Sequence, residues 1–285
     1  MNTEESLRFI DDCFPLSLTS RRALNRIILE IANQGYSDIN GFFEFSTIEG
    51  SPNIRFLHLA FPKSESDMMM RGLWIKKRTQ IISRIASRAG IRVRFREVAR
   101  LVNISLISGC PLQIGCESQG GDIVIKIYLS VLGSKLEQLN AWNFGLRHIL
   151  EAKDWRIDSL GMNLPGYGNS QGKVYAYRRF PVNDSDAAQL YDRARCIRPP
   201  MGKWNGYFSL IGTQKIRHWG PMFRLSSSTN PSSIKLWARF ETPVHPELLA
   251  HLDPGMNDVL GAAFEAGARI SYLTLERDKR GVYFR

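Results

Sequence analysis

The sequence predicts an α+β protein in which a closed antiparallel β-barrel of ten strands is surrounded by helices. Two observations lead to this prediction. Short stretches in which apolar and polar side chains alternate occur in five pairs, and each pair is joined by a turn rich in Gly, Pro, Asn or Ser. Segments with the apolar spacing of amphipathic helices lie between the pairs. The whole chain, residues 1–285, is expected to form one domain.

The clearest strand is residues 121–129, where Lys126 and Tyr128 share one face and Ile125 and Ile127 the other. The same alternation recurs along the chain. The predicted strand pairs are 42–47 with 54–61, 102–107 with 123–130, 156–162 with 173–179, 221–227 with 234–240, and 270–276 with 281–285.

Helices are predicted between these hairpins. The segment 4–34 carries an apolar stripe that includes Leu24, Ile27 and Ile28, and Pro15 is expected to interrupt it. Further helices are predicted at 66–90, 133–152 and 246–266, with one or two shorter ones within 184–219.

Closure of the ten strands follows from the two faces that they present. A closed barrel has no unpaired edge strands, its apolar outer face can be covered by helices, and its polar residues point inward. Eight strands are just filled by side chains, so ten are wide enough to enclose a ligand.

The composition indicates an anionic partner. Thirty-eight Lys and Arg residues against 27 Asp and Glu leave a net charge of +11, with an isoelectric point near 9.7. This excess fits nucleic acid, a membrane surface or a phosphorylated small molecule. No apolar run is long enough to span a membrane, and the acidic N-terminus lacks the pattern of a signal peptide, so a cytoplasmic location is expected.

The cysteines and histidines argue against a metal centre. The four cysteines form no CxxC motif and are expected to be reduced thiols. The five histidines show no HExxH or HxH pattern, so no protein-bound metal is predicted.

Cations and aromatic rings gather on the inward face of the predicted barrel. Buried cations are costly unless an anion compensates them, and a diphosphate would do so. A ring face stabilises a cation by roughly 0.5–2 kcal/mol. Together these groups suit the ionisation of an allylic diphosphate. The inward residues are Arg55, Lys126, Lys173, Lys235, Arg239 and Arg285, with Tyr128, Tyr175, Tyr177, Trp237, Tyr272 and Tyr283.

Two other interpretations of the same pattern stay open. Any solvent-exposed antiparallel sheet alternates in this way. A basic sheet with interleaved aromatic residues also suits RNA or single-stranded DNA, to which the basic segments 71–78 and 92–96 would contribute.

The layout of five hairpins with Lys-x-Tyr strands resembles that of the ABBA-fold prenyltransferases, and within them the cyanobactin-type peptide prenyltransferases. Residues 42–49 followed by 54–61 are similar to that group's first hairpin, and 102–109 leading to 123–128 look like its second. The resemblance covers the whole chain in layout.

The resemblance implies transfer of a prenyl group from dimethylallyl or geranyl diphosphate to a side chain of a cyclic ribosomal peptide. It implies diphosphate binding with help from Mg²⁺, and an acceptor oriented or deprotonated by Glu44. The implied diphosphate ligands are Arg55, Lys126, Lys173, Lys235 and Arg239. The implied cation shield is Tyr128, Tyr175, Trp237, Tyr272 and Tyr283, and the implied limit on prenyl length is Met222 or Phe223.

We therefore expect a monomer with neither nucleic acid nor membrane as partner. Prenylation of a small aromatic metabolite is an alternative, as is a non-enzymatic RNA- or single-stranded-DNA-binding module. The sequence leaves open the acceptor residue, the prenyl length and the number of prenyl groups added.

Overall fold

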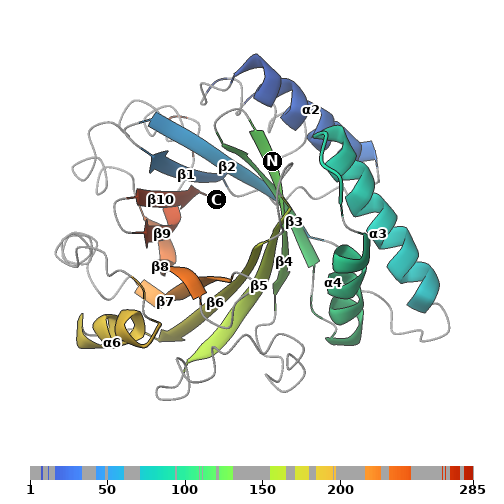
Figure 1. Cartoon of the computed structure of the whole chain (residues 1–285). Coiled ribbons are helices and arrows are strands. Elements are labelled where there is room, and N and C mark those ends of the chain that lie inside the picture. The colour runs from blue at the N-terminus through green and yellow to red at the C-terminus, as the bar shows by residue number, and fades with distance from the viewer. Residues whose placement is uncertain are drawn as a thin grey trace. The chain divides into compact units, whose positions relative to one another are not determined.

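In the computed structural model the chain forms helices and antiparallel strands (Figure 1). The described residues are 8, 12, 17–33, 43–48, 51–60, 71–93, 95–108, 110, 112–119, 122–130, 155–164, 171–179, 184–194, 196, 216–225, 231–244, 265, 267, 270–276 and 279–284. They fall into two compact units. The first takes in residues 1–41, 55–138 and 159–171, and the second takes in 42–54, 139–158 and 172–285.

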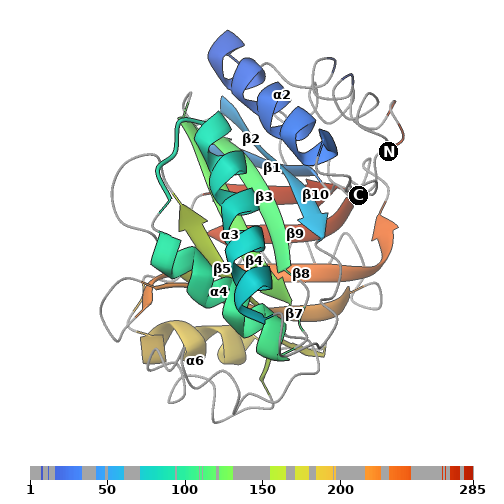
Figure 2. The ribbon, with the colours of Figure 1, turned by 90° about the vertical axis from the view of Figure 1, so that its right-hand side faces the viewer.

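The described elements of the first unit are three helices and an antiparallel sheet. The helices are α2 (Leu18–Asn33), α3 (Arg71–Arg88) and α4 (Phe95–Ser108). The sheet has the order β2-β3-β4-β5, formed by β2 (Ser51–Ala60), β3 (Leu112–Gln119), β4 (Asp122–Ser130) and β5 (Arg156–Leu164). Figures 1 and 2 show the three helices against one face of this sheet.

The helices cover the apolar face that the alternation predicts. Ile114 pairs with Ile127, and Leu129 pairs with both Leu112 and Leu160, so these side chains share one face. All five are buried, as are the apolar stripes of the helices. The apolar side of the sheet and the inner sides of the helices therefore form the core of this unit.

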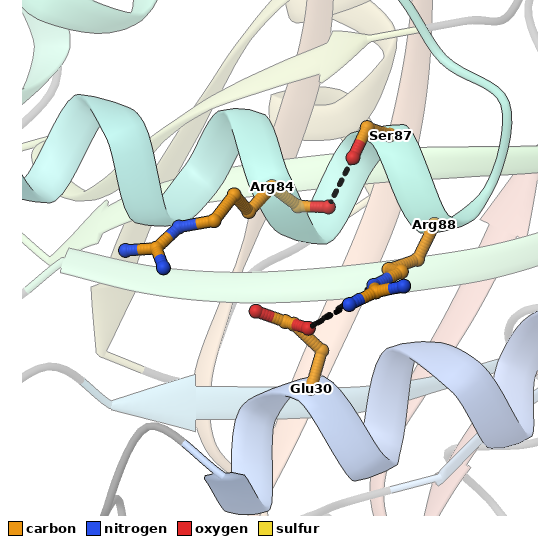
Figure 3. Close-up of polar contacts among 4 residues, drawn as sticks. All are labelled: Glu30, Arg84, Ser87 and Arg88. Carbon is orange, nitrogen blue, oxygen red and sulfur yellow. Dashed lines mark hydrogen bonds and ion pairs between the residues drawn. The ribbon is translucent and has the colours of Figure 1, made fainter.

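Polar contacts connect α2 to α3 (Figure 3). Arg88 lies 2.9 Å from the largely buried carboxylate of Glu30, and its Nε also donates to that carboxylate. The Ser87 hydroxyl donates to the Arg84 carbonyl one turn earlier. α3 ends at Arg88, and the positive φ of 75° at Gly90 allows Ile91 N–H to bond the Ala86 carbonyl.

The predicted strand 102–107 is wrong, because these residues belong to α4. Val98, Leu101, Val102 and Ser105 are buried, and this spacing of three and four residues is that of a helix. A window of six residues also fits the alternation of a strand, and only the longer window separates the two. The strand that pairs with β4 is β3, Leu112–Gln119, so Gly115 lies within a strand rather than in the predicted turn.

The second unit contains six antiparallel strands in the order β6-β7-β8-β9-β10-β1. They are β6 (Gln171–Arg179), β7 (Ile216–Leu225), β8 (Pro231–Val244), β9 (Ile270–Glu276), β10 (Lys279–Phe284) and β1 (Phe43–Ile48). Helix α6 (Asp184–Ala194) contacts β8, where the Tyr191 hydroxyl lies 3.5 Å from the Ile234 carbonyl.

The antiparallel sheets with their helices confirm the α+β class, and the strands of the other four predicted pairs are confirmed. The predicted helices 4–34 and 66–90 are confirmed over Leu18–Asn33 and Arg71–Arg88, and a helix within 184–219 is confirmed as α6. The predicted helix 133–152 lies outside the described residues, as does nearly all of 246–266. None of the helices in the described part of the chain is long and apolar enough to cross a membrane.

Cys110 and Cys196 are free thiols, as predicted for a reduced protein. Burial raises the pKa of the Cys196 thiol above its ordinary value. We expect Cys196 to react with iodoacetamide several-fold more slowly than free cysteine at pH 8, because less of it is thiolate. Mass spectrometry of the labelled peptide, with Cys196→Ser as the blank, measures this rate. A rate equal to that of free cysteine would contradict the buried environment.

Candidate active site

One face of the second unit's sheet collects the predicted cations and rings. In an antiparallel sheet, residues directly opposite each other on neighbouring strands share a face. Tyr175 lies opposite Met222, and Met222 lies opposite Lys235. The pairs Lys173–Arg224, Gly220–Trp237, His218–Arg239, Trp237–Thr274 and Arg239–Tyr272 extend this face over four strands. We call this set, together with Tyr177, the lysine–aromatic face.

The two lysines of this face are shielded from solvent, whereas Arg224 and Arg239 are half-buried. Lys173 is 2% exposed and Lys235 is 4% exposed. An ammonium group so far from water is costly unless anionic or polar groups compensate it, and this cost falls when an anion binds. Arg239 lies with its guanidinium 5.6 Å from the centre of the Tyr272 ring, within the range of a cation–π interaction.

The rings of the face form one cluster. Tyr177, Met222 and Trp237 are buried together, and Tyr175 and Tyr272 pack against them. The Trp237 and Tyr272 ring centres are 6.2 Å apart and tilted by 40°. The Tyr177 ring lies 4.5 Å from the His218 imidazole. The face therefore combines a wall of π-systems with buried positive charge.

Backbone chemistry holds the Trp237 side chain in place. Its Nε1–H donates a 3.0 Å hydrogen bond to the Ala176 carbonyl on β6. Between the pairs Tyr175–Met222 and Arg178–Trp219, the register sets Ala176 against Pro221, which has no N–H to donate. The indole therefore supplies a donor to a carbonyl that the neighbouring strand cannot satisfy at this point.

Gly220 makes this contact possible. The indole reaches from β8 across β7 to Ala176, and Gly220 is its cross-strand neighbour on β7. A Cβ at Gly220 would lie 1.9 Å from the Ala176 carbonyl oxygen, a distance that requires the backbone to shift. Glycine at position 220 is thus required by the close approach of β6 and β7.

Phe223 is not brought to the lysine–aromatic face. It pairs with Val174 and Ile234 on the opposite, apolar face, where it is fully buried. Of the two residues expected to limit prenyl length, only Met222 shares the face with Trp237, because neighbouring residues of a strand point to opposite sides.

Lys126 and Tyr128 belong to the first unit. They are buried on the polar face of its sheet, where Lys126 pairs with Gly115 and Asn163, and Tyr128 with Gln113 and Gly161. Arg55 is opposite Glu117 in the backbone register of β2 and β3.

In the second unit the backbone register places Glu44 opposite Tyr283, and Tyr283 opposite Tyr272. The side chains of Glu44, Arg55 and Tyr283, and residue Arg285, lie outside the described residues.

Sequence reasoning missed His218 because it began this strand at residue 221. In the structure β7 begins at Ile216, and the alternation runs through His218, Gly220, Met222 and Arg224. Extending the period of two by five residues would have found His218, whereas Arg224 lies within the predicted strand and the same alternation already places it beside Met222. Within the described ranges, no three His, Cys, Asp or Glu side chains lie close enough together to hold a metal ion.

Of the comparisons with known proteins, only the one with solved structures finds matches, and it identifies the fold of this chain. No family profile and no curated protein matches the sequence. Among solved structures, 5-dimethylallyltryptophan synthase from Streptomyces coelicolor matches with a TM-score of 0.72 and 16% identity, over 99% of this chain and 95% of that chain. Prenyltransferase PriB in complex with product diphosphate gives a TM-score of 0.69 and 16% identity, over 99% and 94%.

A third match is 6-dimethylallyltryptophan synthase from Micromonospora olivasterospora, in complex with DMASPP and Trp. Its TM-score is 0.62 and its identity 12%, over 99% of this chain and 95% of that chain. The chain therefore has the fold of the ABBA aromatic prenyltransferases.

Proposed function

We propose that this protein transfers a prenyl group from an allylic diphosphate to an organic acceptor. The observation that carries the proposal is the lysine–aromatic face, where two buried lysines and a cluster of rings share one side of a sheet. Buried ammonium groups favour a polyanion, and the rings favour a carbocation. An allylic diphosphate yields both species when it ionises. The structural neighbours named for dimethylallyltryptophan synthesis add support.

We also propose that the two sheets close into the ten-stranded barrel. Only residues 49–50 separate β1 from β2, and only residues 165–170 separate β5 from β6. Connections this short usually join neighbouring antiparallel strands. Joining both pairs would leave no open sheet edge. In such a barrel Arg55, Lys126 and Tyr128 face the same interior as the lysine–aromatic face.

The reaction then runs as a substitution through an allyl cation. The bond between the allylic carbon and the diphosphate oxygen breaks, and the electron pair leaves with the diphosphate. Lys173, Lys235 and Arg239 hold the leaving group, together with Arg55 and Lys126. Rings of Tyr128, Tyr175, Trp237, Tyr272 and Tyr283 surround the cation and exclude water.

The acceptor nucleophile attacks the allylic carbon and loses a proton, for which Glu44 is the proposed base. Magnesium stays a prediction in which the oxygens of the diphosphate supply the ligands, since hard oxygen ligands suit this ion.

For the acceptor we propose a side chain of a peptide, in line with the sequence resemblance. A small aromatic metabolite is the second candidate. It is favoured by the tryptophan in the names of two similar structures.

The test is incubation with dimethylallyl or geranyl diphosphate, with and without Mg²⁺. The acceptors are a panel of cyclic peptides and, separately, tryptophan and related indoles. We expect a product heavier by one prenyl unit in mass spectrometry, and the acceptor that yields it decides between the two candidates. No product with any donor and acceptor would contradict the proposed function.

Met222 is expected to set the prenyl length. It is buried beside Tyr177 and Trp237, so truncation to Ala opens space next to the proposed cation site. We expect Met222→Ala to shift the ratio of geranyl to dimethylallyl transfer toward geranyl by at least about tenfold. Phe223→Leu is the matched control, because Phe223 lies on the opposite face, and it should leave the ratio unchanged. An unchanged ratio in Met222→Ala would show that Met222 does not line the site that binds the prenyl group.

A further inference from the structure

The described residues of α2, α3 and α4 expose positive charge and no carboxylate. Among the described residues of these helices and their connections, nine cations are exposed. They are Arg22, Arg26, Lys76, Lys77, Arg84, Arg88, Arg92, Arg96 and Arg100. Their two carboxylates offset only part of this charge, since Glu30 is buried and pairs with Arg88 and Glu97 is half-buried.

The same surface carries exposed apolar side chains. The large apolar residues that are exposed among the described residues all belong to these three helices. Leu18 is 61% exposed, Ile107 59% and Leu73 56%. Leu29 and Phe95 complete the set. Exposed apolar residues scattered singly over a protein need no explanation, but in the described part of the chain all five lie on one helical layer, which does need one.

Cations and apolar residues occupy the same outward stripes. Residues three or four apart lie on one side of a helix. On α2 the outward stripe is Leu18, Arg22, Arg26 and Leu29, all exposed. On α3 it includes Leu73, Lys77, Gln80 and Arg84, and on α4 Arg96, Arg100 and Ile107. Figure 2 shows the three helices in front of their sheet, and the residues of these stripes are all exposed.

We propose that this layer binds the surface of an anionic lipid bilayer. A bilayer interface offers negative headgroups to the cations and, directly beneath them, an apolar region for the leucines and Ile107. Nucleic acid would satisfy the cations alone and leave the apolar side chains in water. All three helices expose both cationic and apolar side chains, and this combination favours a lipid surface over nucleic acid as the partner.

This proposal departs from the expectation of no membrane partner, and peripheral binding of this kind needs no membrane-spanning segment. The proposed surface is also independent of the lysine–aromatic face and of the reaction proposed there. Its test therefore needs no activity measurement.

The experiment is co-sedimentation of the full chain with large unilamellar vesicles. Vesicles of phosphatidylcholine with about one third phosphatidylglycerol, an anionic fraction chosen to give a strong surface potential, are compared with pure phosphatidylcholine. We expect binding to the anionic vesicles that exceeds binding to the neutral ones by at least about tenfold, and that weakens as salt is raised.

Two variants separate the contributions. Arg22→Gln/Arg26→Gln/Arg84→Gln should lower binding at least about tenfold and flatten its salt dependence. Leu29→Ser/Leu73→Ser should lower binding several-fold and keep the salt dependence. The matched control Arg156→Gln/Arg193→Gln/Arg217→Gln removes three exposed arginines that lie outside α2, α3 and α4, and it should bind as the unaltered chain does.

Equal binding to neutral and anionic vesicles, or none, would overturn the proposal without any variant. So would a Leu29→Ser/Leu73→Ser protein that folds and binds unchanged. Tight binding of transfer RNA or poly-glutamate in place of vesicles would overturn it in favour of a nucleic acid or an acidic polypeptide.

Discussion

Lys235→Met and Lys173→Met are each expected to weaken binding of an unreactive allylic thiolodiphosphate by about 10- to 100-fold. A hydrogen bond to a charged group contributes about 1.5–3 kcal/mol, which corresponds to that range. Both ammonium groups lie on the lysine–aromatic face and are almost fully buried, so water cannot replace them when the charge is removed. Isothermal titration calorimetry measures the change in the dissociation constant.

Methionine keeps most of the volume of lysine, and replacing a buried charge by an apolar group need not destabilise the fold. The matched control is Arg217→Gln, which removes an exposed cation from β7 and should bind the analogue unchanged. If both lysine variants fold and bind as tightly as the unaltered protein, the diphosphate does not lie on this face. That result would not decide whether the protein transfers prenyl groups, which the incubation experiment tests separately.

Gly220→Ala is expected to lower the free energy of unfolding by about 2–4 kcal/mol. The added Cβ would lie 1.9 Å from the Ala176 carbonyl oxygen, which is backbone and has no rotamer to escape into. Separating β6 from β7 would also break the hydrogen bond from Trp237 Nε1 to Ala176. Guanidinium denaturation measures the free energy, and we expect donor binding to weaken with it because Trp237 loses its fixed orientation.

Gly72→Ala is the control for the same chemical change. Gly72 lies in the first turn of α3, and its added Cβ would meet no atom within 4 Å. There the substitution should raise stability by about 0.5–1 kcal/mol, because alanine loses less backbone freedom in a helix than glycine does. A Gly220→Ala protein as stable as the unaltered chain would show that β6 and β7 can separate at little cost.

The face of the strand on which each of the site residues lies could be predicted from the sequence. Lys173 and Tyr175 alternate with buried Val174 and Ala176, and Lys235 and Trp237 do the same in β8. A strand turns successive side chains to opposite faces whatever its surroundings, so this information is local. It sufficed to place four of the residues of the lysine–aromatic face.

The helix α4 could not be predicted in the same way. Residues 102–107 contain β-branched residues and alternate in polarity, so their local pattern fits a strand. Their burial follows a spacing of three and four residues because α4 packs against α3 and the core. Packing among elements distant in the sequence overrode the local preference.

By itself, the sequence determined which side chains of each strand share a face, where most strands and helices lie, and that the charge is strongly positive. These properties depend on backbone geometry over a few residues and on composition. Only the tertiary structure decided which residue lies across from which, such as Gly220 opposite Trp237 and Met222 opposite Lys235. That pairing depends on hydrogen bonds between segments distant in the sequence, and on the position of Pro221, which has no N–H to donate. No local pattern in the sequence carries this information.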